Sequence, residues 1–239
     1  MKAMVLAAGE GRRLRPLTEQ LPKPMVPLGG RPLLEYVVGW LSRYGVRELV
    51  INLHHHPEAI RDHFGDGSAF DVHITYSYEP ELLGTAGAIN AVAHLFAEET
   101  FLIVYGDNLT NCDLARLVAY HKGKGGLATI ALHYREDVTQ SGMVVTDETD
   151  RVTHYQEKPT YSEACSHWVN AGILVAEPAL LRYIPGSGFS DLSRNVLPAA
   201  LADGQKIYGY RMSEDLWWAD SLEEYRGLER LLAAGKIAL

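Results

Sequence analysis

Strand-like apolar runs alternate with amphipathic helical stretches through the first 105 residues, and this alternation restricts the fold more than any other feature. Residues 2–8 read as a strand, and Pro32–Tyr44 carries apolar residues at helical spacing. Further elements are expected as strands at Glu48–Leu53, Val72–Tyr76 and Thr100–Tyr105, and as helices at Pro57–Phe64 and Thr85–Phe96. A βαβα order predicts a mostly parallel central sheet flanked by helices on both faces.

The second half of the chain has a different pattern, with strands joined by short polar links and little helix between them. The expected strands are Leu127–Tyr134, Met143–Thr146, Val152–Gln156 and His167–Val175, followed by helices at Asp191–Leu201 and Ser221–Ala234. Ser221 and Glu224 form a capping-box pattern at the start of the last helix. No low-complexity linker or internal repeat interrupts the chain, so we predict one α/β domain over residues 1–239 with a smaller α+β extension.

Composition excludes several classes of partner. The chain has 22 Lys and Arg against 30 Asp and Glu, a net charge of −8, whereas nucleic-acid binding usually requires a basic face. No apolar run approaches the ~18 residues of a membrane span, and no secretory signal pattern opens the sequence. With two widely spaced cysteines, these features predict a reduced, cytoplasmic protein with no nucleic-acid or membrane partner.

The loop that follows the first strand combines two glycines with a local cluster of positive charge. Its glycines are Gly9 and Gly11, its basic residues are Arg12, Arg13 and Arg15, and Lys23 follows between two prolines. Glycines let backbone N–H groups approach a ligand, and fixed cations suit a polyphosphate, although a tight turn with solvated arginines is the alternative. The spacing matches neither a dinucleotide-binding fingerprint nor a P-loop.

This segment resembles the signature of the sugar-1-phosphate nucleotidylyltransferases. The matching pattern is Gly9-x-Gly11-x-Arg13-x-x-Pro16-x-Thr18, followed by Pro22-Lys23-Pro24. The resemblance implies a Rossmann-like domain of the GT-A type that binds a nucleoside triphosphate (NTP), a sugar 1-phosphate and Mg²⁺. The nucleotide contacts it implies here are Leu6, Ala8, Gly9, Gly11, Arg12, Arg13 and Lys23. Residues 1–125 would form the nucleotide-binding part, 126–220 the sugar-phosphate-binding part and 221–239 a C-terminal helix. We do not expect the fused β-helix of hexapeptide repeats that some members carry.

Two aspartates are the predicted metal ligands. Asp107 follows a buried strand in Gly106-Asp107-Asn108, where ligands of parallel sheets bind, and its carboxylate suits Mg²⁺. Asp220 matches the aspartate that the family places after a tryptophan, but Ser221-Leu222 stands where Gly-Thr is common. The alternatives are an Asp-Asn turn at residue 107 and a helix-terminal charge at residue 220.

Further matches point to the sugar phosphate. Glu157-Lys158-Pro159 corresponds to the family's Glu-Lys-Pro, in which the glutamate accepts from sugar hydroxyls and the lysine meets the phosphate. The predicted sugar-phosphate contacts are Asn108, Gly142, Glu157, Lys158 and Asn170. A solvated strand end and a β-bulge are the structural alternatives for this region.

The resemblance implies nucleotidyl transfer by direct in-line attack, with Arg13, Lys23 and Asp107 as the catalytic residues. The Leu83-Gly84-Thr85-Ala86-Gly87 segment is most similar to that of mannose-1-phosphate guanylyltransferases. We therefore predict GTP and mannose 1-phosphate as substrates, with a carboxylate of Glu79 or Glu81 and the backbone of Gly84 and Thr85 reading guanine.

Several alternatives to this prediction remain open. They are a uridylyl- or thymidylyltransferase, a cytidylyltransferase for a non-sugar phosphate, a non-catalytic NDP-sugar-binding homologue and a GT-A glycosyltransferase. The single aspartate of Gly106-Asp107-Asn108-Leu109 argues against the last, which would carry Asp-x-Asp. A monomer or a homodimer is expected.

Overall fold

The computed structural model describes residues 1–237 and divides the chain into two compact units. Unit 1 contains Met1–Leu82, Val104–Cys112 and the chain from Glu214 onward, and unit 2 contains Leu83–Ile103 and Asp113–Ser213. The strand β6 (Phe101–Tyr105) is shared between them. Each unit is assembled from separated segments of the chain. The single domain with divisions at residues 125 and 220 stays a prediction.

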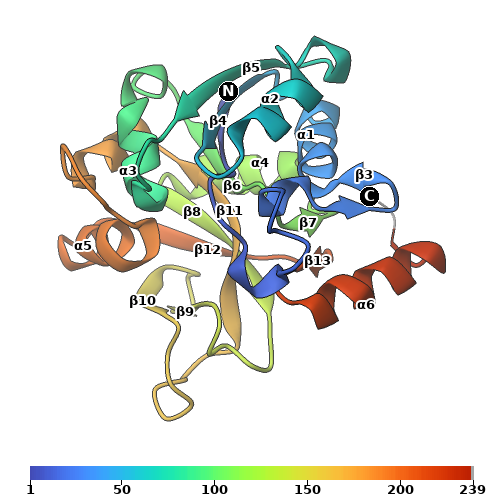
Figure 1. The fold of residues 1–239 in the computed structure, drawn as a ribbon. Coiled ribbons are helices and arrows are strands. Elements are labelled where there is room, and N and C mark those ends of the chain that lie inside the picture. The colour runs from blue at the N-terminus through green and yellow to red at the C-terminus, as the bar shows by residue number, and fades with distance from the viewer. Residues whose placement is uncertain (238–239) are drawn as a thin grey trace. The chain divides into compact units, whose positions relative to one another are not determined.

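Unit 1 is built on three parallel strands. They are β1 (Lys2–Leu6), β4 (Glu48–Leu53) and β5 (His73–Tyr78). β4 lies between the other two, with Leu6 opposite Asn52 and Asn52 opposite Ser77 (Figure 1). The carboxyl ends of all three strands therefore meet at one edge, and the loops that leave them share that edge.

The helices of unit 1 follow from local sequence. α1 (Leu33–Arg43) buries the apolar side that its spacing predicts, Leu33, Leu34, Val37, Val38 and Leu41. α2 (Pro57–Phe64) has proline at its first position, where no N–H is needed, and ends at Gly65. The two predicted helices and the strand β4 between them are confirmed.

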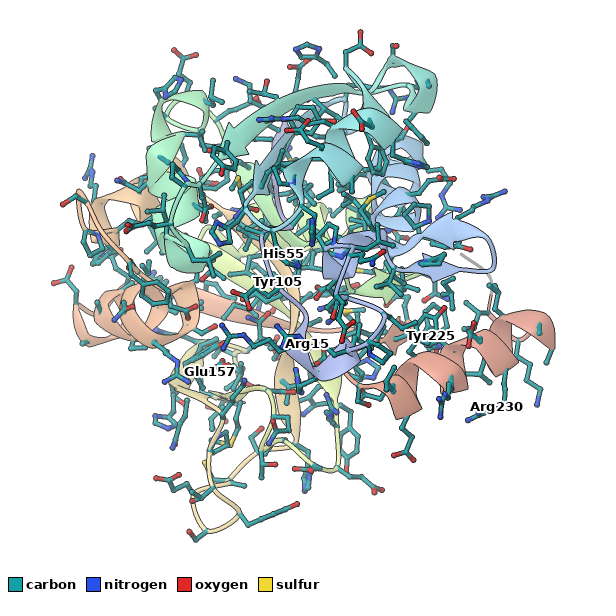
Figure 2. All side chains as sticks on the ribbon, viewed as in Figure 1. Arg15, His55, Tyr105, Glu157, Tyr225 and Arg230 are labelled. Carbon is teal, nitrogen blue, oxygen red and sulfur yellow. The ribbon has the colours of Figure 1, made fainter. Side chains whose placement is uncertain are left out.

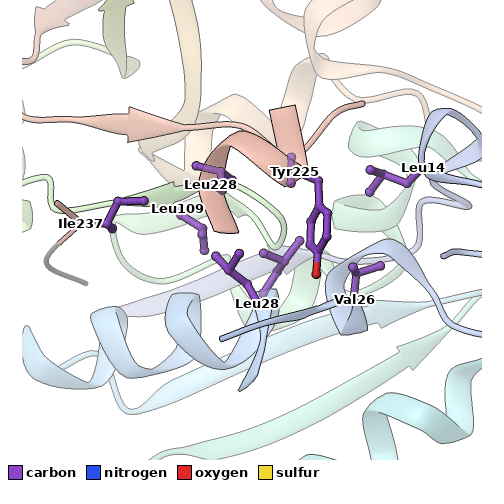
Figure 3. Packing of buried hydrophobic residues seen from close by; sticks show 9 residues of the cluster. Leu14, Val26, Leu28, Leu109, Tyr225, Leu228 and Ile237 are labelled. Atoms are coloured by element: carbon purple, nitrogen blue, oxygen red, sulfur yellow. The ribbon is translucent and has the colours of Figure 1, made fainter. Parts of the chain in front are cut away.

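The last segment of unit 1 packs against its N-terminal part. α6 (Leu222–Ala233) begins at Ser221, whose hydroxyl accepts from the Glu224 N–H, so the predicted capping box is confirmed. Two short ribbons lie beside it, β2 (Pro27–Leu28) with β3 (Arg31–Pro32), and β7 (Leu109–Thr110) with β13 (Leu216–Trp217). Figure 3 shows Tyr225 and Leu228 of α6 in one apolar cluster with Leu28. Unit 1 is therefore held together by residues about 200 positions apart.

Unit 2 contains a mixed sheet with three helices. Its strands are β8 (Ala128–Tyr134), β9 (Gly142–Thr146), β10 (Val152–Glu157), β11 (Trp168–Ala176) and β12 (Ile207–Arg211). β11 pairs antiparallel with β8 and β9, β9 pairs antiparallel with β10, and β12 pairs parallel with β8. The helices are α3 (Gly84–Ala91), α4 (Leu114–Lys124) and α5 (Leu197–Ala202), the last preceded by a π-helical turn at Leu192–Val196.

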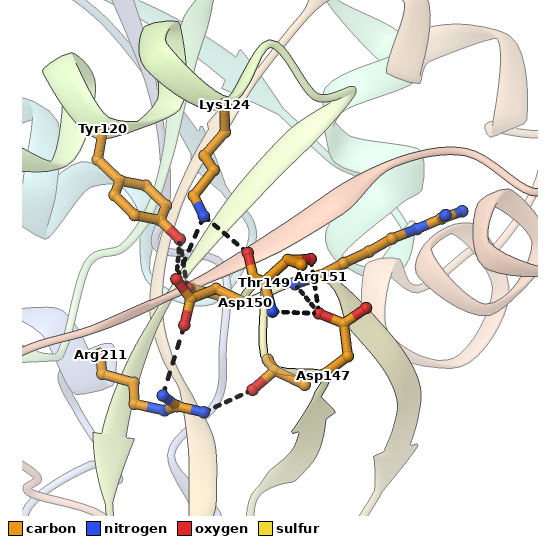
Figure 4. A network of polar contacts seen from close by, with 9 residues as sticks. Tyr120, Lys124, Asp147, Thr149, Asp150, Arg151 and Arg211 are labelled. Carbon is orange, nitrogen blue, oxygen red and sulfur yellow. Dashed lines mark hydrogen bonds and ion pairs between the residues drawn. The ribbon is translucent and has the colours of Figure 1, made fainter.

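A polar network ties the β9–β10 turn to α4 and β12. The Asp150 carboxylate accepts from the Tyr120 hydroxyl at 3.1 Å and pairs with Lys124 at 3.3 Å and Arg211 at 3.4 Å (Figure 4). Asp147 accepts from the backbone N–H groups of Thr149 and Arg151, which shapes the turn itself. The network holds the turn end of the hairpin, whereas the predicted sugar-phosphate residues Gly142 and Glu157 pair at its other end.

The predicted strands are found within one or two residues. Helix α4, strand β12 and the two-residue strands β2, β3, β7 and β13 escaped prediction. Helix α4 has a recognisable start, because the Asp113 carboxylate accepts from the Arg116 N–H, and a recognisable end at Gly125. β12 is only five residues long, with Tyr208 and Tyr210 on either side of Gly209. The predicted helix at 85–96 ends at Ala91 and continues only as a 3₁₀ turn, Ala93–Leu95. No helix within residues 1–237 combines the length and the apolar character required to cross a bilayer.

Leu28→Ala should destabilise unit 1, because Leu28 is fully buried against α6. Leu17→Ala is the matched control, since Leu17 is 37% exposed in the same unit. We expect Leu28→Ala to lower the free energy of unfolding by about 2–5 kcal/mol and Leu17→Ala by no more than about 0.5 kcal/mol. Urea denaturation measures both, and equal losses would contradict the packing described here.

Candidate active site

Two glycines shape the loop after β1, each in a different way. A methyl group on Gly9 would meet nothing within 4 Å, so backbone at this point is open to a ligand. Gly11 has φ of +63°, and a Cβ there would lie 2.7 Å from Cβ of Lys23. The Thr18 hydroxyl donates to the Gly11 carbonyl at 2.8 Å. The loop therefore folds back onto the Lys23 segment, which only glycine at position 11 permits.

The arginines of this loop differ in their partners. Arg12 pairs with Glu10 at 2.6 Å, and this contact is the main cause that lowers the pKa of the half-buried Glu10 carboxyl. Arg13 reaches Oδ2 of Asp220 with its Nη2 at 3.3 Å while half of its side chain stays exposed. Arg15 is exposed in the same loop (Figure 2). Among these three arginines, Arg13 is thus the one whose guanidinium reaches a predicted metal ligand, Asp220.

Lys23 is the centre of the site in unit 1. It is 8% exposed, and its Nζ lies 2.6 Å from Oδ2 of Asp107 and 2.5 Å from Oδ1 of Asp220. Burial opposes the charged form of this lysine, but the two carboxylates outweigh it, so the pKa of Lys23 is raised. Residues 23, 107 and 220 are distant in sequence, and the fold of unit 1 brings their side chains into direct contact.

The Asp107 and Asp220 carboxylates fit a magnesium ion. Both carboxylates contact the same ammonium nitrogen, and both supply the hard oxygen ligands that Mg²⁺ prefers. Within residues 1–237 no group of three or more His, Cys, Asp or Glu side chains could hold a metal. Two carboxylates are sufficient where phosphate oxygens and water complete the shell.

The Asp220 carboxylate contacts Lys23 and Arg13, and it stands directly before Ser221, which caps α6. The Glu224 carboxylate accepts from the Asp220 N–H at 3.0 Å. Ser221 therefore forms the cap where Gly-Thr is common in the family, and the alternative of a helix-terminal charge at residue 220 stays open.

A buried polar chain connects the ends of the three strands of unit 1. The Ala7 N–H donates to Oδ1 of Asn52 at 2.7 Å, and Nδ2 of Asn52 donates to Oε1 of Glu79 at 2.8 Å. Glu79 is only 1% exposed, whereas Glu81 is exposed. Leu6 and Ala8 flank the first bond of this chain, and the Leu6 carbonyl accepts from the Gly106 N–H at 2.9 Å. Sequence reasoning missed Asn52, although an amide inside the apolar strand Glu48–Leu53 was a usable signal.

Unit 2 holds Gly84 and Thr85 at the start of α3. Gly84 has φ of +75°, and a Cβ there would lie 2.4 Å from the Ser190 carbonyl oxygen. That carbonyl accepts from the N–H groups of Ala86 and Gly87. The Thr85 hydroxyl donates to Asp191 at 3.0 Å and accepts from the Leu192 N–H at 2.8 Å. These hydrogen bonds therefore hold the turn at residues 190–192 against the start of α3.

Three of the predicted sugar-phosphate residues meet around one tyrosine of unit 2. Gly142 lies opposite Glu157 in the β9–β10 pair, and a Cβ on Gly142 would lie 2.0 Å from the Tyr155 hydroxyl. Asn170 of β11 donates to the same hydroxyl at 3.3 Å. Burial, and next the Asp191 charge, raise the pKa of the Glu157 carboxyl. Lys158 is exposed with φ of +51°, and its N–H donates to the Ser141 carbonyl.

Asn108 is the exception in the predicted sugar-phosphate set. It is 9% exposed and follows Asp107 in unit 1, while the other four residues belong to unit 2. Tyr155 was missed by sequence reasoning. Its position two residues before Glu157, on the same face of β10, was the available signal.

A family model described as nucleotidyl transferase matches residues 2–221. The chain belongs to the nucleotidyl transferase family. The predicted family resemblance is therefore confirmed.

Two curated relatives are comparably similar to the chain. One is the UTP–glucose-1-phosphate uridylyltransferase of Synechocystis sp., 36% identical over 233 residues, with 92% of this chain and 60% of the relative covered. The other is the mannose-1-phosphate guanylyltransferase of Mycobacterium tuberculosis, 37% identical over 219 residues, with 91% and 60% covered. The chain thus spans about 60% of the length of these relatives.

Solved structures agree on the fold. A putative glucose-1-phosphate thymidylyltransferase from Bacillus anthracis, in complex with a sucrose, superposes with a TM-score of 0.88 at 22% identity, covering 100% of this chain and 97% of that one. A UDP-glucose pyrophosphorylase complexed with UDP-glucose gives 0.86 at 18% identity, covering 98% of each chain. The predicted fold class, Rossmann-like with a mostly parallel sheet and flanking helices, is confirmed.

Gly11→Ala should destabilise the site, because alanine there is strained at positive φ and its Cβ collides with Lys23. We expect a loss of about 1–2 kcal/mol or more in the free energy of unfolding, while Gly9→Ala, which adds a methyl group to open space, stays within about 0.5 kcal/mol. Parallel denaturant titrations compare the two, and a Gly11→Ala protein as stable as Gly9→Ala would refute the close loop packing.

Proposed function

We propose that this chain transfers a nucleotidyl group from an NTP to a sugar 1-phosphate, which yields an NDP-sugar and pyrophosphate. An oxygen of the sugar phosphate attacks the α-phosphorus, and the bond from that phosphorus to the bridging oxygen of the departing pyrophosphate breaks in line. No enzyme nucleophile is needed, so positioning and charge stabilisation carry the rate.

The observation that carries this proposal is the ammonium of Lys23 held between Asp107 and Asp220, with Arg13 on Asp220. Such a group places fixed positive charge and hard oxygen ligands together beside an open glycine loop. Lys23 stabilises the negative charge that develops on the α-phosphate, and Arg13 with the backbone of the Gly9–Arg12 loop binds the β- and γ-phosphates.

We assign Asp107 and Asp220 as the ligands of Mg²⁺. When bound, the ion would polarise the α-phosphate and offset its charge. The two carboxylates already lie together in unit 1, so neither needs a large movement to serve.

For the second substrate, the proposal uses the residues of unit 2. The Glu157 carboxylate accepts hydrogen bonds from sugar hydroxyls, the Asn170 amide donates to one, and Lys158 binds the phosphate. Glycine at 142 admits the Tyr155 hydroxyl beside Glu157, which no larger residue would allow.

A pyrophosphate-release screen of GTP, UTP, dTTP, CTP and ATP against a panel of sugar 1-phosphates with Mg²⁺ tests the reaction. Release should require both an NTP and a sugar 1-phosphate. Binding of an NDP-sugar without pyrophosphate release from any pair would favour the non-catalytic alternative.

Within this reaction we propose GTP and mannose 1-phosphate as the preferred pair. The Leu83–Gly87 segment and the guanylyltransferase relative support this choice. Of the two candidate carboxylates, the exposed Glu81 is available to a base, whereas Glu79 is buried against Asn52.

UTP with glucose 1-phosphate is the second candidate. The burial of Glu79 removes one of the two carboxylates offered for guanine, and the uridylyltransferase relative is as similar as the guanylyltransferase. The kcat/KM values of the five NTPs decide between the two candidates.

Lys23→Met should lower kcat by about 10²–10³-fold at saturating NTP, because it removes one pre-placed charge at the reacting phosphate. Methionine keeps an unbranched stem against Gly11, and thus the loop packing. Arg31→Met is the control, since Arg31 pairs with Glu35 on the exposed surface of unit 1. Unchanged kcat in Lys23→Met would remove Lys23 from the mechanism.

Asp107→Asn and Asp220→Asn should each abolish Mg²⁺-dependent turnover, and the double variant should be little worse than either single one. Residues that act as one unit lose function together. Direct Mn²⁺ binding, followed by electron paramagnetic resonance, should weaken in the same variants. Independent, additive losses would contradict a shared cation.

A further inference from the structure

Tyr155 places a phenol hydroxyl inside unit 2 where an apolar ring would suffice for packing. It lies on β10 opposite Val144 of β9 and is 6% exposed. A buried hydroxyl costs free energy unless it is hydrogen-bonded, so its partners explain why a tyrosine is accommodated.

The hydroxyl stands in the middle of a directional hydrogen-bond chain. Nδ2 of Asn170 donates to the Tyr155 oxygen at 3.3 Å, and the Tyr155 hydroxyl donates to Oγ of Ser193 at 2.8 Å. The Tyr155 hydroxyl thus both accepts and donates, and the Ser193 N–H in turn donates to Oδ1 of Asp191 at 2.9 Å. The Glu157 carboxylate lies beside this chain, because its Oε2 and the Tyr155 hydroxyl would both crowd a Cβ placed on Gly142.

The Asn170 end of this chain is a residue assigned to the sugar. Oδ1 of Asn170 accepts from the Gly172 N–H at 2.8 Å, so the amide is held at both its oxygen and its nitrogen. This leaves one N–H of the amide for a ligand. Gly142 completes the arrangement, because the Tyr155 hydroxyl fills the place that a side chain at 142 would need.

We propose that Tyr155 is a positioning residue for sugar recognition, which holds the Asn170 amide in one fixed orientation beside the Glu157 carboxylate. The inference rests on the proposed function. It adds that one oriented donor, Asn170, and one neighbouring acceptor, Glu157, together select a sugar 1-phosphate by its ring hydroxyls.

Tyr155→Phe is the sharpest test, because it removes only the hydroxyl. We expect KM for the sugar 1-phosphate to rise about tenfold, while KM for the NTP and kcat stay within about twofold. Ser193→Ala breaks the next link and should have the same signature. Tyr120→Phe is the matched control, since its hydroxyl bonds Asp150 and the Gly209 carbonyl in the same unit, and it should leave both KM values unchanged.

Isothermal titration of the sugar 1-phosphate into wild type, Tyr155→Phe and Tyr120→Phe separates the outcomes. An active wild type whose sugar affinity survives Tyr155→Phe overturns the inference alone. Equal loss of sugar and NTP affinity, with a fall in melting temperature, also overturns it, because that pattern marks a purely structural role. A wild type that neither binds nor uses any sugar 1-phosphate overturns the proposed function as well.

Discussion

The ammonium of Lys23 is almost fully buried, and the pair of aspartates around it makes that burial possible. An unpaired charge in such a place would be neutralised or expelled, and loss of one partner of a buried pair commonly costs about 3–5 kcal/mol. Asp107 and Asp220 each contact Nζ, and Arg13 contacts Asp220 in turn. Three segments of unit 1 therefore converge on one nitrogen atom, and each limits where the others can lie.

Side-chain hydrogen bonds hold the carboxyl ends of the three strands from which the loops of this site begin. Asn52 links the Ala7 N–H to the Glu79 carboxylate, so the ends of β1, β4 and β5 are joined by side chains as well as by the sheet. His54 adds a contact to the Glu79 carbonyl at 2.8 Å. The glycine loop consequently starts from a rigid base, which is the condition for binding a flexible triphosphate without a large ordering cost.

Local sequence patterns were enough to predict most strands and helices of both units, because apolar spacing and capping residues act over a few positions; α4 and β12 are the main exceptions. Arg13, Lys23, Asp107 and Asp220 could be assigned because a family signature carries them. Asn52 and Tyr155 left only weak local signals, because their importance arises from partners 27 and 38 residues away, Glu79 and Ser193. The burial of Glu79 was likewise invisible, since a glutamate in a strand-to-helix loop is usually solvated.

The separation of 197 residues between Lys23 and Asp220 has a consequence for synthesis on the ribosome. Chains emerge from the N-terminus at about 5–20 residues per second. Lys23 and the apolar side of Leu28 are therefore exposed for many seconds before α6 and Asp220 are available to cover them. Unit 2, whose segments end at Ser213, is translated completely before the final segment of unit 1 begins. The nascent protein thus passes through a state in which unit 2 can fold while unit 1, which holds Lys23, still lacks its closing helix.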